Sequence, residues 1–184
     1  MSDVVSEKKS QTPEREISAG VIAWRPTQDG PRFLILYHGS NYWNFPKGKI
    51  EKEERSFQTA IREMQEETGL SRRDLKFHDG FRVKETFSFR RLIGRSKRRG
   101  SKVNKTVIFY MAQTRKKDVH IGKEQGFGWF TYREALKLFP SEKHKDTRRI
   151  LKQAHDFLCQ QKKRREEQQK NRQEKSRRQK NNNR

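Results

Sequence analysis

Hydrophobic residues along this 184-residue chain fall into short runs separated by polar turns. The apolar runs at 17–24 and 33–37 flank a turn that contains Asp29-Gly30, so they predict two strands joined by a hairpin. Residues 106–112 are apolar on both faces, which is typical of an interior strand, and residues 127–130 predict another short strand.

Alternation of apolar and polar residues predicts one more strand near the middle of the chain. Its apolar face is formed by Phe81, Val83, Phe87 and Phe89. The preceding stretch, residues 39–49, is rich in Gly, Asn and Pro and predicts a loop with aromatic anchors. Loops of this kind often line binding sites.

Helical periodicity predicts three helices. The first spans residues 57–68, with Ser56 as the expected N-cap and Gly69 as a left-handed C-terminal residue. A capping-box signal, Thr131 with Glu134, predicts a short helix ending near Phe139. A third helix begins near Asp146 and presents an apolar stripe formed by Ile150, Leu151, Ala154, Phe157 and Leu158.

This order of strands and helices indicates an α/β sandwich. We expect a disordered N-terminus at residues 1–15, one domain at 16–158 and a basic tail at 159–184. The tail has too little apolar surface to fold alone, so it is expected to be disordered or a frayed helix.

The composition is strongly basic. There are 45 Lys and Arg residues against 23 Asp and Glu, which gives a net charge of +22. Two segments, residues 90–105 and 160–184, carry +8 each. Such a charge favours a polyanionic partner such as nucleotide phosphates or RNA, while the alternative is a solvated tail that aids solubility.

Several classes of protein are excluded by composition. No apolar run approaches the ~20 residues of a spanning helix, and the start lacks a signal-peptide core, so a cytoplasmic protein without a membrane segment is expected. A single cysteine, Cys159, excludes an internal disulfide and a cysteine-based zinc site. Any metal must therefore be held by carboxylates.

Three glutamates form a stripe on the first predicted helix, namely Glu63, Glu66 and Glu67. They repel one another and lie at the helix end where the macrodipole disfavours anions. A divalent cation would offset that repulsion, and oxygen ligands suit Mg²⁺ or Mn²⁺. The alternative for an isolated Glu-x-x-Glu-Glu is a solvated acidic face.

The wider pattern settles that alternative. Residues 48–70 read Gly, five residues, Glu, seven residues, Arg-Glu-Met-x-Glu-Glu-x-Gly-Leu, and so match every fixed position of the Nudix box. A chance match is on the order of 1 in 10⁷. The chain therefore resembles the Nudix hydrolases, which implies an α/β/α sandwich with a mixed sheet and Mg²⁺- or Mn²⁺-dependent cleavage of nucleoside diphosphate derivatives.

The resemblance also implies roles for individual residues. Metal binding is expected from Glu63, Glu66, Glu67 and Gly48, and catalytic roles from Glu54, Arg62, Glu63 and Glu66. Arg62 should orient one glutamate by a charge-assisted bond, and Glu54 should brace the loop or hold metal through water. Gly48 and Gly69 should supply tight backbone turns.

Beyond the box, the chain resembles the asymmetric diadenosine tetraphosphate hydrolases over residues 16–158. This resemblance implies that Lys47 and Lys105 bind the substrate's phosphates and that Phe87 stacks on a base, although Phe87 could instead belong to the core. Glu124 is the candidate catalytic base, with a surface glutamate as the alternative.

The leading hypothesis is a monomeric hydrolase that cleaves diadenosine tetraphosphate to ATP and AMP. One alternative keeps the chemistry and takes RNA 5′ ends, gripped by residues 90–105 and 160–184. Another is an RNA-binding protein with a relic box, against which the intact glutamates argue. Residues 90–105 lengthen a connection that is short in the family, and are expected to form an exposed loop or to hold phosphates.

Overall fold

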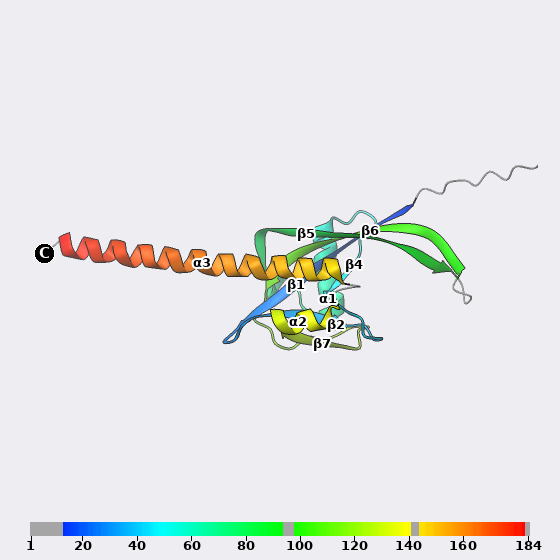
Figure 1. Ribbon diagram of the computed structural model, residues 1–184, viewed down its shortest axis with the longest axis horizontal. Helices are drawn as coiled ribbons and strands as arrows, with labels where there is room; N and C mark the ends of the chain where they lie inside the picture. The colour runs from blue at the N-terminus through cyan, green and yellow to red at the C-terminus, as the bar shows by residue number, and fades with distance from the viewer. Residues whose placement is uncertain (1–12, 94–97, 141–143, 183–184) are drawn as a thin grey trace, which may run out of the picture.

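The computed structural model describes residues 13–93, 98–140 and 144–182. Its strands are β1 (Glu14–Thr27), β2 (Gly30–Tyr37), β3 (Trp43–Asn44), β4 (Lys47–Lys49), β5 (Lys76–Ile93), β6 (Arg98–Gln113) and β7 (Gly126–Thr131). Its helices are α1 (Ser56–Thr68), the 3₁₀ turn η1 (Arg72–Asp74), α2 (Tyr132–Leu138) and α3 (Lys145–Asn182), arranged as in Figure 1.

The strands form one mixed sheet in the order β3-β2-β1-β6-β5, with β4 paired to β1 and β7 paired to β2. β1 and β6 run parallel, and the other pairs are antiparallel. The predicted α/β fold with a mixed sheet is therefore confirmed.

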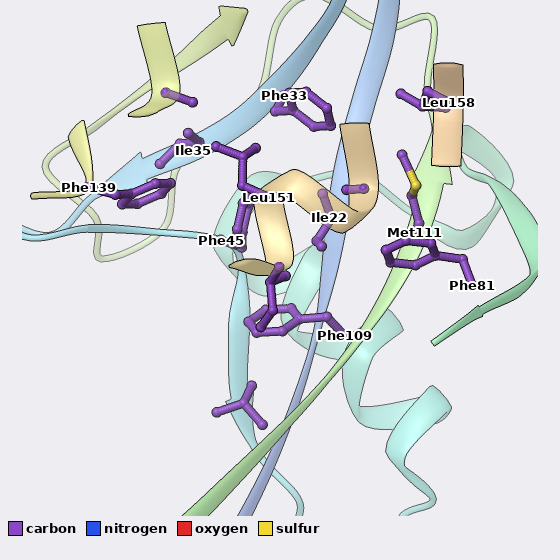
Figure 2. Close-up of a cluster of buried hydrophobic side chains, with 14 residues drawn as sticks. Ile22, Phe33, Ile35, Phe45, Phe81, Phe109, Met111, Phe139, Leu151 and Leu158 are labelled. Carbon is purple, nitrogen blue, oxygen red and sulfur yellow. The ribbon is translucent and has the colours of Figure 1, made fainter. Parts of the chain in front are cut away.

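Two hydrophobic clusters cover the two faces of this sheet. Alternation along β1 sends Ile22 to a cluster with α2 and α3, whereas Val21 faces a cluster with α1. Figure 2 shows the first cluster, in which Phe45 and Phe109 pack edge to face. The buried side chains of β6 belong to both clusters, which confirms the prediction of an interior strand.

Two local predictions need correction. The expected loop at 39–49 contains the short strands β3 and β4, because its backbone pairs with β2 and β1. Ser56 is not the N-cap of α1. Arg55 holds that place with an extended backbone, and the Ser56 hydroxyl instead bonds the Tyr110 hydroxyl at 2.7 Å. The C-terminal prediction is confirmed, since Gly69 has a φ of 70° and its N–H donates to Gln65.

The basic segment is not an inserted loop as expected. β5 and β6 continue outward as a two-stranded ribbon, with Arg90 opposite Lys102, and only residues 94–97 of the segment lie outside the described part. The backbone pairing of the two parent strands simply continues, and Arg90 and Arg91 at its start are exposed. The ribbon projects beyond the rest of the sheet (Figure 1).

The two ends of the chain also refine the prediction. Glu14 and Arg15, which were expected to be disordered, already belong to β1. α3 packs its predicted apolar stripe on the sheet and then continues as a helix to Asn182, projecting from the side opposite the ribbon (Figure 1). No helix in the described part of the chain is long and apolar enough to cross a membrane.

Candidate active site

The candidate site lies where α1 packs against β4. β4 is paired to β1 with Gly48 opposite Ala19, and Ala60 and Met64 anchor α1 in the cluster beneath. Because apolar residues fix one side of the helix, the spacing of the box directs its glutamates toward β4 and the loop that follows it. The fold thus brings the carboxylates of α1 to one edge of the sheet.

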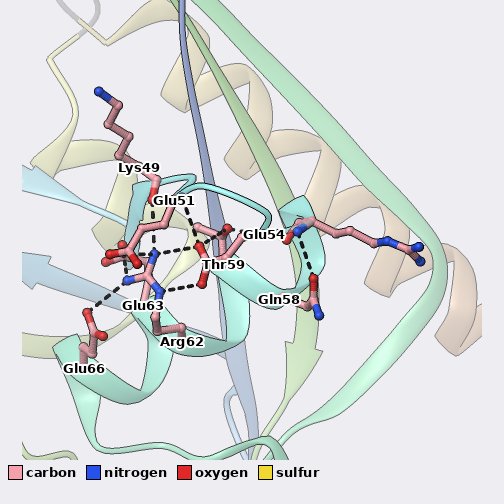
Figure 3. A network of polar contacts seen from close by, with 9 residues as sticks. Lys49, Glu51, Glu54, Gln58, Thr59, Arg62, Glu63 and Glu66 are labelled. Atoms are coloured by element: carbon pink, nitrogen blue, oxygen red, sulfur yellow. Dashed lines mark hydrogen bonds and ion pairs between the residues drawn. The ribbon is translucent and has the colours of Figure 1, made fainter.

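The Arg62 guanidinium stands at the centre of this edge (Figure 3). It forms a bidentate ion pair with Glu54, in which Nε and Nη2 donate at 2.8 Å and 3.0 Å. Its Nη1 donates to Glu63 at 2.8 Å and to Glu66 at 3.1 Å, and Nη2 also donates to the Lys49 carbonyl oxygen. Arg62 therefore orients three carboxylates, where the sequence predicted one.

Glu54 is the most fully bonded of these carboxylates. Besides the Arg62 pair, its Oε2 accepts the Thr59 hydroxyl at 2.7 Å and the Glu51 backbone N–H at 3.1 Å. Hydrogen bonds from Arg62 and then from Thr59 lower the pKa of Glu54 to about 2. This geometry agrees with a carboxylate that braces the loop before α1.

Glu67 lies in a contrasting environment. Its Oε2 accepts one hydrogen bond, from the Lys47 backbone N–H at 2.9 Å. The pKa of Glu67 is raised to about 7, chiefly by burial and also by the negative charges of Glu124 and Glu63, against the opposing hydrogen bond and charge of Lys47. Burial likewise raises the pKa of Glu63, although Arg62 opposes this. Negative charge is thus concentrated here: Glu63 is paired with Arg62, whereas the hydrogen bond that Glu67 accepts comes from a neutral backbone N–H.

Gly48 makes room for one of these carboxylates. A Cβ atom at this position would lie 1.8 Å from Oε1 and 2.2 Å from Oε2 of Glu63. Gly48 was expected to form a tight turn, but it lies within strand β4, so that expectation was wrong. The position excludes a side chain because the Glu63 carboxylate lies directly against its backbone.

The donor set suits a hard divalent cation. It consists of carboxylates beside the exposed backbone of β4, and hard cations prefer such oxygen ligands. In residues 13–93, 98–140 and 144–182, no three acidic, imidazole or thiol groups converge as a complete metal site. Arg62 Nη1 bridges Glu63 and Glu66, so joint binding of a cation by these two requires that this bridge give way.

Glu124 approaches the site from the loop before β7. The loop is fixed to the end of α1, since the His120 N–H donates to the Thr68 carbonyl oxygen at 3.0 Å. The Glu124 carboxylate accepts the Gly122 N–H at 3.1 Å and lies close enough to Glu67 to raise its pKa. Its role as catalytic base stays a prediction.

The predicted substrate residues lie in different settings. Lys47 begins β4 and lies near enough to His38 and Glu85 to affect the pKa of both side chains. Lys105 lies on β6 beside β1 and forms an ion pair with Glu16 at 2.6 Å. Phe87 is 39% exposed, so the core alternative for it is wrong.

Three residues near Lys47 were missed by the sequence reasoning. The Nε2 atom of His38 is buried without a hydrogen-bond partner, and its ring packs at 5.4 Å from that of Tyr42. Glu85 is buried on β5, and burial raises its pKa. A signal for Glu85 was present, because it is the one acid on the otherwise apolar face of its predicted strand. His38 and Tyr42 gave no such signal.

Comparison with known proteins identifies the family. A model described as the NUDIX domain matches residues 14–154. The chain belongs to the NUDIX family. The asymmetrical bis(5′-nucleosyl)-tetraphosphatase of Sus scrofa is 33% identical over 132 residues, which cover 69% of this chain and 80% of that protein. The Mus musculus protein of the same name is 31% identical and covers 77% of this chain and 95% of its own.

Solved structures support the same NUDIX fold. A C. elegans Ap4A hydrolase in a binary complex superposes with a TM-score of 0.64 at 23% identity, covering 78% of this chain and 98% of that one. The NUDIX domain of Shewanella oneidensis NrtR, complexed with ADP ribose, superposes with a TM-score of 0.54 at 16% identity and covers 83% and 93%.

Proposed function

We propose that this NUDIX protein is a divalent-cation-dependent hydrolase that cleaves dinucleoside tetraphosphates asymmetrically, giving ATP and AMP from diadenosine tetraphosphate. The observation that carries the proposal is the clustering of Glu63 and Glu67 beside the β4 backbone, where the hydrogen bond that Glu67 accepts comes from a neutral backbone N–H. The names of the mammalian relatives support the choice of substrate.

The metal ligands in this proposal are Glu63, Glu66 and Glu67, with the Gly48 backbone beside them. A cation held there would be Mg²⁺ or Mn²⁺, and would supply charge neutralisation of phosphate oxygens and an acidified water. Arg62 and Glu54 fix the directions of the carboxylates before substrate arrives. Glu124 is the proposed acceptor of a proton from the attacking water.

The substrate's phosphate chain is proposed to lie along Lys47, whose backbone is fixed by Glu67. Lys105 is the proposed second phosphate ligand and would have to exchange its Glu16 partner for phosphate. Phe87 and Phe89, whose ring centres lie 6.1 Å apart on the ribbon, offer exposed aromatic faces to a base.

The two alternatives from the sequence are weaker. The relatives named above act on nucleosyl tetraphosphates, so RNA 5′ ends are not favoured as substrates. A relic box would not need a glycine kept free for a buried carboxylate. RNA as a binding partner, a monomeric state and a cytoplasmic location stay predictions.

Product analysis tests the proposal. The full chain is incubated with diadenosine tetraphosphate and millimolar Mg²⁺, and nucleotides are separated by chromatography. We expect equal amounts of ATP and AMP, no cleavage with a chelator, and much slower turnover of 5′-triphosphate or capped RNA. Formation of two ADP molecules, or faster turnover of either RNA, would contradict the assignment.

A further inference from the structure

A second cleft lies away from the glutamates, at the other end of β1. It has a volume of about 600 Å³ and lies between the β1–β2 turn, the start of β5 and α3. Trp24 and His78 form its aromatic wall, with stacked rings 5.8 Å apart and an Nε1–H to Nε2 hydrogen bond of 3.0 Å. Lys162, Arg165 and Glu166 of α3 also line the cleft, as does Asp29 of the β1–β2 turn.

The cleft shares no lining residue with the candidate active site. On β1 the site adjoins Ala19 and Gly20, which pair with β4, whereas Trp24 lies four residues farther along. Four residues of strand correspond to about 13 Å. Trp24 also lies on the sheet face that carries α3, opposite the face that carries α1. A ligand in this cleft would therefore be separate from the hydrolase substrate.

The helix that leaves the cleft is basic over its whole exposed length. α3 lines the cleft as far as Gln169, and its last part projects from the domain (Figure 1). At about 100° per residue, five basic positions fall within about 140° of its circumference, and the three glutamates lie outside that arc. The five are Arg164, Arg165, Arg172, Lys175 and Arg178.

This surface fits a phosphate backbone better than a membrane. From Arg164 to Arg178 the helix rises about 21 Å, so its charges can follow several successive phosphates. An interfacial membrane helix needs an apolar face opposite its basic one, and residues 162–179 are polar and exposed on every side. The basic side chains of β5 and β6 are less available to a phosphate than those of α3. Arg91 and Lys105 already form ion pairs with Glu14 and Glu16.

We propose that the cleft and the projecting half of α3 form one binding surface for single-stranded nucleic acid. A base enters the cleft and stacks on the Trp24–His78 wall, while Lys162 and Arg165 meet its phosphate. The adjoining phosphates then run along the acid-free arc of the helix. A single strand is required because bases within a duplex are already stacked and cannot enter a cleft.

The first test compares charge-reversed variants of the full chain. The probe is a fluorescently labelled oligouridine of about twelve nucleotides, within the usual range of such sites, followed by anisotropy. We expect Arg165→Glu with Arg172→Glu to weaken binding about tenfold or more. The control, Arg73→Glu with Arg115→Glu, makes the same change in net charge at exposed positions elsewhere and should bind within about twofold of the unaltered protein.

A second test leaves the protein unchanged and alters the ligand. An abasic strand of equal length keeps the phosphates and should bind about fivefold or more weakly, since stacking contributes ~1–3 kcal/mol per base. Cys159 is the chain's one cysteine and lines the cleft, so oligouridine should also slow its alkylation by N-ethylmaleimide. The abasic strand should protect Cys159 less.

Four outcomes would overturn the proposal. They are equal loss of binding in the two charge-reversed proteins, equal affinity for abasic and complete strands, tighter binding of a duplex than of the single strand, and alkylation of Cys159 at the same rate with and without oligouridine. Binding of anionic phospholipid vesicles with no binding of oligouridine would assign the helix to a membrane surface instead.

Discussion

The two ends of the glutamate site differ in how their charge is balanced. At one end, Glu54 accepts bonds from Arg62, Thr59 and the Glu51 backbone, and its pKa falls to about 2. At the other end, Glu67 is more buried, accepts one backbone N–H, and has a pKa raised to about 7. Both carboxylates belong to the same motif, yet one is satisfied by the protein and the other is not.

This difference distinguishes a carboxylate that stabilises the fold from one that is available to bind a cation. A carboxylate with all its partners in the protein stabilises the fold, whereas one buried among other acids costs stability unless a further positive charge arrives. We therefore propose that Glu54 and Arg62 position the site, and that Glu67 together with Glu63 binds a cation.

The largest effect is expected from Glu67→Gln. Loss of a metal ligand should lower turnover of diadenosine tetraphosphate at least about a hundredfold. The matched control is Glu53→Gln, an exposed glutamate in the same motif, which should retain nearly full activity. Near-normal turnover by the Glu67 variant would remove that residue from the site.

Gly48→Ala should lower turnover about tenfold or more, because its Cβ would displace the Glu63 carboxylate. The displaced atoms are the end of a flexible side chain, so little change in melting temperature is expected. In the control, Gly126→Ala, the new Cβ would meet Tyr37 at an ordinary 3.8 Å. Equal activity of the two variants would show that the position of Glu63 is unimportant.

The two Glu→Gln changes should move stability in opposite directions when divalent cations are absent. Glu54→Gln removes the charge that Arg62 pairs with and should lower the melting temperature. Glu67→Gln removes a buried charge and keeps an acceptor for the Lys47 N–H, so the melting temperature should stay the same or rise. Thermal melts in a chelator measure both, and a lower value for the Glu67 variant would contradict the contrast.

The smallest effect is a dependence on pH. The pKa of Glu67 is raised from 4.5 to about 7 on folding, so the folded state holds this proton more tightly. Its stabilising effect is complete below pH 4.5 and is lost as the pH rises through 7. In a chelator, the unaltered protein should thus lose melting temperature relative to Glu67→Gln as the pH rises over this window. A constant difference would argue against the raised pKa.

Much of the fold was predictable because short-range patterns and the packed faces agree. Alternation and the double apolar face of residues 106–112 identified β5 and the interior strand β6, and Gly69 marked the end of α1. The ribbon was not predictable. Its register comes from pairing of the backbone, which leaves no hydrophobic pattern, and Arg90 and Arg91 are exposed.

The candidate site was predictable as a list of residues but not as an arrangement. Sequence spacing placed Glu63, Glu66 and Glu67 together on α1. It could not show that Arg62 bridges several carboxylates or that the Lys47 backbone meets Glu67, because these contacts join segments through the tertiary fold. The cleft beside Trp24 was hidden for the same reason, since its walls come from β1, β5 and α3.

The central claim is that Glu63 and Glu67 hold a divalent cation at β4. Titration of Mn²⁺ followed by electron paramagnetic resonance of the free ion tests it most directly. We predict that the unaltered protein and Glu53→Gln take up Mn²⁺ alike, and that Glu63→Gln and Glu67→Gln each bind it at least about tenfold more weakly. Equal affinity in all four proteins would contradict the account.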